Sequence, residues 1–241
     1  PLKIAFLVVF SQLLGCHKFI DIKDIWHQHN PDCRIEEIMY HPGFGPDTVY
    51  ARFNYNHKGN PTSILFSHVT TSRPNELFKY DIKGRLTDYI GPYENNNHYE
   101  FWYRYQFDGK GRVISDTQYV FGETINGQPS NNTLISPGSY EYDAFDRVRK
   151  VKRGYPPPAA GIAAYAIIDE YLYNAAGNLE VHNQYFNSII AGSDSTIFTG
   201  SDTLQYDNKV NIRRTNKLWM FLDRNYSKNN AIPAAGKFEL S

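Results

Sequence analysis

Carboxylates that recur along the chain are the residues most suggestive of chemistry. Four aspartates each open a short turn-forming stretch: Asp81, Asp108, Asp143 and Asp207. Two carboxylates at a suitable separation can act as acid and base on a glycosidic bond. Each of these aspartates, however, starts a predicted turn, where its side-chain oxygen accepts hydrogen bonds from the backbone. We therefore expect structural roles for them and assign no catalytic residue.

Arginines and histidines are the other candidates for a site. Arg85, Arg112 and Arg147 recur directly after these turns, and we expect them to pair with neighbouring acids or to stack on tyrosine rings. His27 and His29 would share one side of a strand, but no third ligand follows at metal-site spacing. The chain also lacks a nucleophile elbow, a P-loop and a zinc-protease motif. We predict neither a metal site nor a cofactor.

The elements that must position these residues are β-hairpins of one repeated pattern. Residues 78–86 read aromatic-x-aromatic-Asp-x-x-Gly-Arg-Leu. Phe78 and Tyr80 are two apart, so in a strand they point to the same face. Asp81 can start a turn, and Gly84 supplies the positive φ that ends it. The pattern predicts two antiparallel strands joined by a tight turn.

The same pattern occurs six times, with its second aromatic at positions 55, 80, 107, 142, 173 and 206. The last copy is degraded, because Val210 stands where the turn glycine is expected, and we expect a different turn there. In the fourth copy Asp146 replaces that glycine. The predicted structural turn residues are Asn56, Gly59, Asp81, Gly84, Asp108, Gly111, Asp143, Asp146, Asn174 and Gly177.

These tandem copies resemble the YD repeat of the RHS family, in which Tyr-Asp-x-x-Gly-Arg hairpins line up as one long sheet. Together with the N-terminus described below, the chain looks most like the small YD-repeat-like lipoproteins of Bacteroidota, a group of unknown function. The resemblance covers roughly residues 33–212. It implies an architecture, and it brings no catalytic residue to this chain.

Composition supports an all-β chain without a nucleic-acid partner. The 241 residues include 19 Tyr and 15 Phe, and aromatic residues favour strands. Lys and Arg total 25, as do Asp and Glu, and this balanced charge argues against nucleic acid or an anionic membrane surface as the main partner. We predict an antiparallel meander of about 10 to 13 strands forming one large twisted or curled sheet, either open or barrel-like.

The N-terminus resembles a bacterial lipoprotein leader. Lys3 precedes a short apolar run, and Leu13-Leu14-Gly15-Cys16 resembles a lipobox. Residues 1–15 would then be a signal peptide, and Cys16 would carry a lipid that anchors the chain to a membrane. The expected location is the bacterial cell envelope, at the outer membrane, either periplasmic or surface-exposed. The alternative is that this run is a buried strand or short helix.

The rest of the chain divides into a tether (16–32), a β-sheet domain (33–222) and a C-terminal tail (223–241). Cys33 reads as a small buried residue, although a Cys16–Cys33 disulfide is possible if Cys16 carries no lipid. We expect a long loop from 122 to 138, and a strand or short helix over 212–221.

The densest aromatic cluster is the best candidate for binding a ligand. It lies in the longest predicted strand, residues 98–107, and comprises Tyr99, Phe101, Trp102, Tyr103 and Tyr105. Alternation predicts the four Tyr and Phe residues on one face and Trp102 on the other. Such rings suit sugar stacking and protein contact. The alternative is that one aromatic face is simply the covered side of the sheet.

We therefore expect a non-enzymatic cell-envelope lipoprotein, whose β-repeat scaffold presents loops and an aromatic face to an envelope protein or a glycan. One alternative is a relative of RHS shells that is associated with a secreted polypeptide or toxin. A second is an envelope hydrolase acting on glycans.

Overall fold

The computed structural model describes residues 34–40, 48–94, 97–130, 134–155, 164–190, 193–211, 214 and 216–232. The predicted leader, Cys16, Cys33 and the predicted tether lie outside these ranges. The described residues form fifteen strands and one helix. The strands are β1 (Glu37–Tyr40), β2 (Val49–Tyr55), β3 (Pro61–Phe66), β4 (Glu76–Tyr80), β5 (Leu86–Pro92), β6 (His98–Phe107), β7 (Val113–Ile125), β8 (Gln128–Pro129), β9 (Leu134–Tyr142), β10 (Val148–Tyr155), β11 (Ala164–Tyr173), β12 (Leu179–Ile190), β13 (Ser193–Thr203), β14 (Gln205–Val210) and β15 (Asn229–Ile232), and the helix is α1 (Lys217–Leu222).

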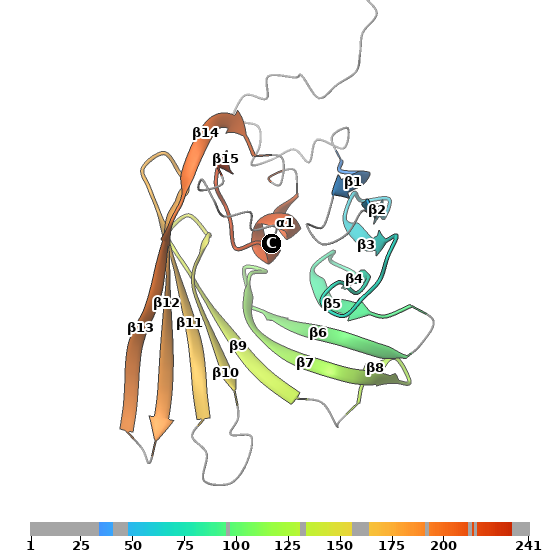
Figure 1. Cartoon of the computed structure of the whole chain (residues 1–241), viewed down its shortest axis with the longest axis horizontal. Coiled ribbons are helices and arrows are strands. Elements are labelled where there is room, and N and C mark those ends of the chain that lie inside the picture. Colours follow the sequence, from blue (N-terminus) through green and yellow to red (C-terminus); the bar gives the residue numbers. More distant parts are fainter. Residues whose placement is uncertain are drawn as a thin grey trace, which may run out of the picture.

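Thirteen strands form one antiparallel sheet in which each strand pairs with its neighbours in the chain. The short strand β8 pairs only with β7, so β9 follows β7 in the sheet. The sheet curls into an arc with β1 and β13 at its two ends, and it stays open (Figure 1). β14 and β15 pair separately. The predicted all-β meander of hairpins is confirmed, in its open form.

Five of the six repeat copies form hairpins with the same turn. In the second copy, the N–H of Asp81 donates to the carbonyl of Arg85 at 3.0 Å, and the N–H of Gly84 donates to the carbonyl of Asp81 at 2.9 Å. Gly84 has a φ of 80°, the left-handed conformation that glycine adopts at least cost. The same two bonds recur in the turns opened by Asn56, Asp108, Asp143 and Asn174.

Each of these five hairpins also carries one extra residue shortly after its turn. Tyr80 pairs with Leu86, whereas Lys79 pairs with Asp88, so Thr87 is left over as a β-bulge. The equivalent residues of the other hairpins are Thr62, Ile114, Arg149 and Glu180. A bulge bends its strand and increases the local twist. Repeated at one position in every hairpin, it accounts for the curl of the whole sheet.

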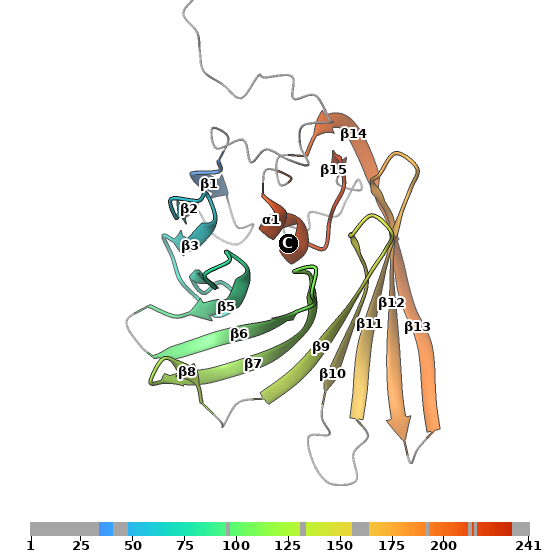
Figure 2. The ribbon, with the colours of Figure 1, turned by 180° about the vertical axis from the view of Figure 1, so that it is seen from behind.

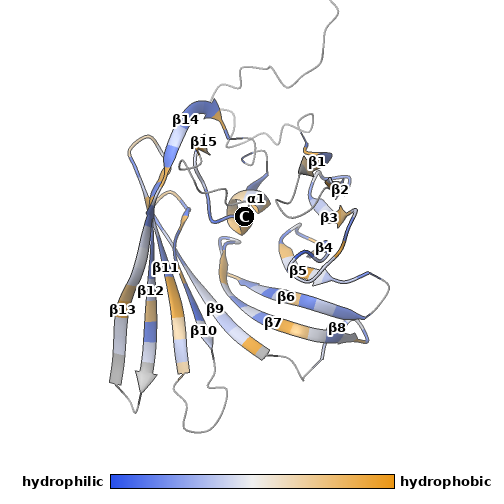
Figure 3. Ribbon diagram, in the orientation of Figure 1, coloured by the Kyte–Doolittle hydropathy of each residue, from blue (hydrophilic) through white to orange (hydrophobic). Residues whose placement is uncertain are grey.

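Helix α1 lies within the curve of the sheet and packs against one face, which we call the inner face (Figure 1, Figure 2). Leu218, Trp219 and Phe221 of α1 are buried in the main core, and Figure 3 shows hydrophobic residues of α1 inside the curve. The Trp219 ring meets Phe53 and Phe78 edge-on, with centroid distances of 5.6 and 5.7 Å. The C-terminal part of the chain therefore fills the space that the sheet encloses.

Two segments bear on earlier expectations: one prediction was wrong, and one open alternative is settled. The predicted loop over 122–138 is wrong for most of its length, because β7 continues to Ile125 and β9 begins at Leu134. Asn126 and Gly127 both have positive φ, and they form the tight turn that joins β7 to β8. Of the two possibilities left open for 212–221, the structure has a short helix.

The sixth repeat copy and the C-terminal segment are joined to each other. β14 carries the sixth copy and pairs with β15 rather than continuing the main sheet. Asp207 Oδ1 accepts the N–H of Lys209 at 2.9 Å, and Asp207 also contacts Asn230. The expectation of a different turn in this copy is wrong, because residues 205–210 continue as one strand with a register shift between Tyr206 and Val210. Part of the predicted tail, Asn229–Ile232, is a strand in this structure.

Candidate binding site

The repeated aspartates are held by their own turns. Asp108 Oδ1 accepts the backbone N–H groups of Lys110 and Arg112, each at 2.9 Å, and its Oδ2 accepts Arg112 Nε at 2.8 Å. Backbone donation from Arg112 is the main cause that lowers the pKa of Asp108. Asp81 and Asp143 make the same three bonds with their own turns.

The arginines of these turns join each hairpin to the next one. The guanidinium of Arg85 lies over the Phe107 ring at 4.7 Å. Arg112 lies over Tyr142 at 5.0 Å, and Arg147 lies over Tyr173 at 4.1 Å. A cation over an aromatic face is held there by a cation–π attraction, so each turn is bound to the following copy of the repeat. The turn residues form a continuous structural seam along one rim of the sheet.

The predicted aromatic cluster is divided between the two faces of the sheet, and one assignment was wrong. Tyr99 lies with Trp102, not with the other tyrosines, and their rings meet edge-on at 5.6 Å. The cause is a bulge at Glu100, because Gly91 pairs with Phe101 whereas Pro92 pairs with Tyr99. One extra residue reverses the alternation of side chains. No pattern in the sequence predicts the bulge at Glu100.

Phe101, Tyr103 and Tyr105 keep the predicted arrangement on the inner face. The Tyr103 and Tyr105 rings stack at 6.2 Å, and Tyr105 packs edge-on against Phe221 of α1 at 5.5 Å. Tyr103 Oη accepts a hydrogen bond from Gln118 at 2.7 Å. Tyr105 is only 6% exposed, because α1 packs against this side of the rings.

Trp102 is enclosed on the opposite, outer face. It is 2% exposed, and its Nε1 donates to Asp88 Oδ1 at 2.7 Å. Lys79 and Arg104 lie over its ring at 4.8 and 5.7 Å. The indole therefore offers almost no surface to a ligand as the structure stands.

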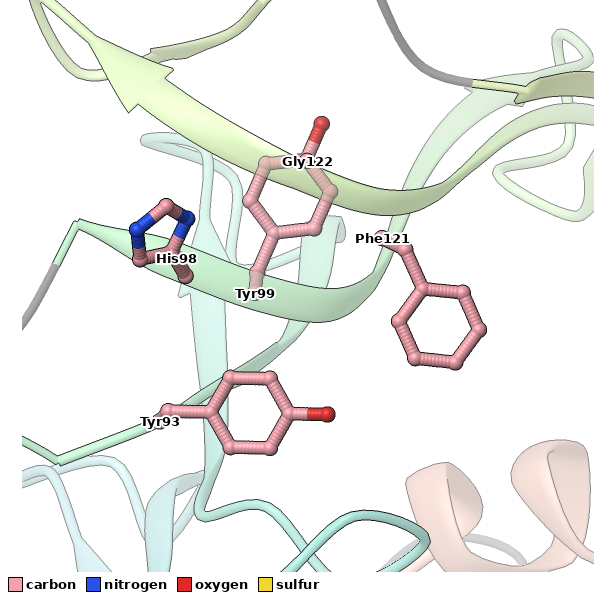
Figure 4. Close-up of a pocket in the computed structure, with 5 residues that line it drawn as sticks. All are labelled: Tyr93, His98, Tyr99, Phe121 and Gly122. Atoms are coloured by element: carbon pink, nitrogen blue, oxygen red, sulfur yellow. The ribbon is translucent and has the colours of Figure 1, made fainter.

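A hollow beside this cluster is the better candidate for a binding site. It has a volume of about 350 Å³ and is lined by Tyr93, His98, Tyr99, Phe121 and Gly122 (Figure 4). Tyr93 follows β5, His98 and Tyr99 begin β6, and the other two come from β7. Of the five, only Tyr99 belonged to the predicted cluster. Phe121 and Gly122 were missed because they belong to another strand and reach this hollow only through the pairing of β6 with β7.

Phe121 is the exposed ring of this hollow. Its φ is 50°, a left-handed conformation that is rare for a bulky residue. The side chain is 62% exposed, and it borders the hollow rather than filling a core. Strained backbone geometry tends to persist at functional sites. The hollow can therefore offer an open aromatic face to a flat apolar surface of a ligand.

Two residues that line the hollow, Tyr93 and His98, contact carboxylates outside it. Glu100 Oε2 accepts Tyr93 Oη at 2.8 Å and the backbone N–H of Ser72 at 2.7 Å. Burial and the hydrogen bond to Glu100 raise the pKa of Tyr93. Glu123 lies 3.7 Å from His98 Nδ1. Polar groups beside aromatic rings are the combination that orients a hydroxylated ligand.

A buried polar network lies elsewhere, between the inner face and the C-terminal segment. Arg153 makes two hydrogen bonds to Asp116, at 2.8 and 2.7 Å, and Tyr140 Oη donates to the same carboxylate. Arg224 then donates to Tyr140 Oη at 3.0 Å. Gly138 leaves the room for the ion pair, since a Cβ there would lie 2.7 Å from Arg153 Nη2. Both carboxylate oxygens of Asp116 accept hydrogen bonds, so we assign this network a structural role.

A second polar group lies on the inner face of β11 and β12. His182 Nε2 lies 2.8 Å from Asp169 Oδ1, and the Tyr171 ring stacks on the imidazole at 4.9 Å. Although burial opposes it, the hydrogen bond with His182 contributes to lowering the pKa of Asp169. Within the described ranges, no three His, Cys, Asp or Glu side chains are grouped to hold a metal ion. No described helix is long and apolar enough to span a membrane.

Comparison with known proteins gives only distant similarities. No protein-family model matches the chain, and no curated protein matches it at the significance applied. It is similar to part of the crystal structure of TcdB2-TccC3-Cdc42, with a TM-score of 0.35 and 13% identity over 73% of this chain and 9% of that one. It is also similar to part of the Tc holotoxin pore of Photorhabdus luminescens, with a TM-score of 0.28 and 13% identity over 67% of this chain and 10% of that one. The chain spans about a tenth of the length of either structure, and these scores assign it no fold or function.

Proposed function

We propose that this chain is a non-enzymatic binding scaffold of the bacterial cell envelope, and that its hollow binds a glycan. The observation that carries the proposal is Phe121, a strained and 62% exposed ring that lines the hollow with Tyr93 and Tyr99. Two of the lining residues, Tyr93 and His98, contact the carboxylates of Glu100 and Glu123. Sugar rings present flat C–H faces that stack on aromatic rings, and their hydroxyl groups bond to carboxylates. The rest of the repeat supports a scaffold role, because its aspartates and arginines are engaged in turns.

A glycan array with the purified chain tests this proposal. Phe121→Ala should lose at least tenfold in affinity for the glycan that the wild type binds. Phe145→Ala is the matched control, because Phe145 is 69% exposed at a turn tip far from the hollow in sequence. Equal binding by wild type and Phe121→Ala would contradict the proposal, provided that circular dichroism shows both to be folded.

The anchor belongs to the same proposal and rests on the lipobox-like sequence alone. Cys16 would carry the lipid that holds the scaffold to the outer membrane, either periplasmic or surface-exposed. Expression of Cys16→Ala in a bacterial host should abolish incorporation of labelled fatty acid and release the chain from the membrane fraction. Retention of the label by this variant would show that Cys16 is not the lipidated residue.

One observation favours a second candidate function, an RHS-like shell associated with another polypeptide. The inner face already encloses a polypeptide segment, since Trp219 and Phe221 of α1 lie against it. A secreted polypeptide or toxin would be held against the same kind of aromatic surface. Co-expression with the product of an adjacent gene should then protect that product from added protease. Unchanged digestion in the presence of the chain would remove this candidate.

A further inference from the structure

Three lysines occupy the same place in the first three turns of the repeat. Lys58, Lys83 and Lys110 are each the third of the four turn residues, and all three are exposed. Their backbone N–H groups donate to the side chain of the residue that opens the turn, in every case at 2.9 Å. Because the turn geometry is the same, the three side chains leave the sheet from equivalent positions at the hairpin tips.

These three turns lie side by side along one rim of the sheet. A Cβ on Gly84 would lie 3.7 Å from Asn60 Nδ2 of the first turn. A Cβ on Gly111 would lie 3.9 Å from Arg85 Cδ, which follows the second turn. Successive hairpins are two strands apart, which is about 10 Å within a sheet. The lysines therefore form a row rather than three isolated charges.

The acidic residues of these turns do not neutralise the lysines. Asp81 and Asp108 each form an ion pair with the arginine that follows their own turn, at 2.7 and 2.8 Å. Asn56, which opens the first turn, carries no charge. Each hairpin end therefore keeps one net positive charge, that of its lysine. Exposed Lys217 adds a further charge beside the first turn, because the neighbouring Asn216 donates to a carbonyl of that turn at 3.3 Å.

Apolar side chains project from the same rim. Ile82 is 95% exposed, and it directly precedes Lys83 at the tip of the second turn. Phe145 is 69% exposed at the tip of the fourth turn, which the 2.7 Å bond from Arg112 to Asp146 joins to the third. Basic side chains around exposed apolar ones favour binding to anionic lipid, because the charges meet the headgroups while the apolar groups enter the interface.

The opposite rim of the sheet carries exposed acidic residues. The hollow lies there, with Glu94 and Glu123 exposed close to its lining residues in the chain. Strand β6 separates the hollow from the third turn, and its ten residues are about 33 Å long. Figure 1 shows the turn between β6 and β7 at the end near α1 and β8 at the other end. An anionic surface would attract the turns and repel the opposite rim, so charge favours one orientation.

We propose that the turn rim, defined by Lys58, Ile82, Lys83, Lys110 and Lys217, binds the surface of an anionic phospholipid membrane. The lysines meet the phosphate headgroups, and Ile82 enters the boundary between headgroups and acyl chains. The first three turns contain no Phe, Tyr or Trp on which a base could stack, so lipid fits this rim better than single-stranded nucleic acid. The hollow would then face away from the membrane.

This inference depends neither on glycan binding in the hollow nor on a lipid at Cys16. Its test is sedimentation of the full chain with lipid vesicles, in proteins that all carry Cys16→Ala so that no acyl group contributes. The chain should bind at least tenfold better when about a third of the phosphatidylcholine is replaced by phosphatidylglycerol. A lysine close to an anionic leaflet strengthens binding about fivefold. Replacing Lys58, Lys83 and Lys110 by Gln should therefore lower this binding at least tenfold.

Matched controls separate the rim from charge and apolar surface in general. Replacing Lys79, Lys150 and Lys152 by Gln removes the same charge from β4 and β10, and should leave binding to the anionic vesicles unchanged. Ile82→Ser should weaken that binding severalfold. Ile125→Ser should not, because Ile125 is 56% exposed but ends β7 at the opposite rim. Circular dichroism establishes that the variants are folded.

Three results would overturn the proposal. They are equal binding to both kinds of vesicle, equal losses in the two lysine triples, and binding of soluble polyphosphate without binding of vesicles. The last result would assign the rim to a soluble polyanion instead. Glycan affinity should be the same in the wild type and in the triple variant of the rim. A failure here therefore leaves the proposed glycan site standing, and a failure of the glycan site leaves the membrane contact standing.

Discussion

At the scale of single residues, the side chain that opens each repeat turn makes several hydrogen bonds at once. Asp108 accepts two backbone N–H groups through one oxygen and an arginine through the other. The first and fifth copies have Asn56 and Asn174 in that place, and Asn60 and Asn178 in place of the arginine. The backbone contacts therefore need only a side-chain oxygen, while the negative charge serves the arginine.

Substituting Asp108 separates these two duties. Asp108→Asn keeps an acceptor for the backbone, so it should lower the melting temperature less than Asp108→Ala does. Asp108 has a lowered pKa in the folded state, so its charge adds stability at neutral pH. That stability is lost as the pH falls through the lowered pKa. The difference between wild type and Asp108→Asn, measured by thermal melts from pH 7 to pH 2, should therefore shrink towards acid.

The two glycines of the third turn should respond differently to alanine. Gly111 has a φ of 81°, whereas Gly109 has an ordinary backbone and open space where a Cβ would lie. A left-handed conformation costs alanine about 1 kcal/mol or more. Urea unfolding should show that loss of stability for Gly111→Ala and little change for Gly109→Ala. Equal effects would mean that the turn does not depend on its left-handed residue.

At the scale of elements, α1 stabilises the sheet far beyond its length. A helix of six residues is not stable alone, so tertiary packing must hold it. Asn216 caps its start, with its side chain accepting the N–H of Leu218 at 2.8 Å. Trp219 then contacts β2 and β4, and Phe221 contacts β6 and β9. The helix thus ties together strands from both halves of the meander.

Removing the Trp219 ring should cost much of the stability of the fold. Trp219 is 7% exposed, and truncating a buried aromatic residue to alanine costs about 3 to 5 kcal/mol. Chemical unfolding of Trp219→Ala should show a loss of this size. Lys217→Ala, at an exposed position two residues earlier in α1, should change the free energy of unfolding by less than about 0.5 kcal/mol. A small effect at Trp219 would mean that α1 is not the core element of the inner face.

At the scale of the whole molecule, a buried polar network fastens the C-terminal segment to the middle of the sheet. It connects Asp116 on β7, Tyr140 on β9 and Arg153 on β10 with Arg224 beyond α1. The Asp116 side chain is fully buried, and that of Arg153 is 13% exposed. Such a pair is costly to break, because a single remaining charge is left without a partner.

A double-mutant cycle measures this coupling. Asp116→Asn leaves the Arg153 charge buried without its partner, and should destabilise the fold by about 3 to 5 kcal/mol. Arg153→Met alone should lower the free energy of unfolding by a similar amount, because it leaves the Asp116 charge unpaired. The double variant should lose clearly less than the sum of both losses, because neither charge then remains unpaired. Additive losses in urea unfolding would show that the two side chains act independently.

The repeat was predictable because each hairpin is specified by residues close in sequence. The turn aspartate bonds to groups two and four positions ahead, so Asp81 to Arg85 and its relatives reveal their geometry in the sequence alone. Aromatic alternation gave the strands, and tandem order gave the meander. The candidate hollow was not predictable, because Tyr93 and Phe121 meet only through the pairing of β5, β6 and β7.

What the sequence alone determined is therefore the hairpin unit, its turn chemistry and its antiparallel order. Only the tertiary structure decided which aromatic rings are covered, because a single bulge at Glu100 moved Tyr99 to the face of Trp102. It also decided that the chain's own helix fills the inner face. The bond between Arg224 and Tyr140 spans 84 positions. Contacts over such distances depend on how the whole sheet curls, and no local pattern of residues encodes them.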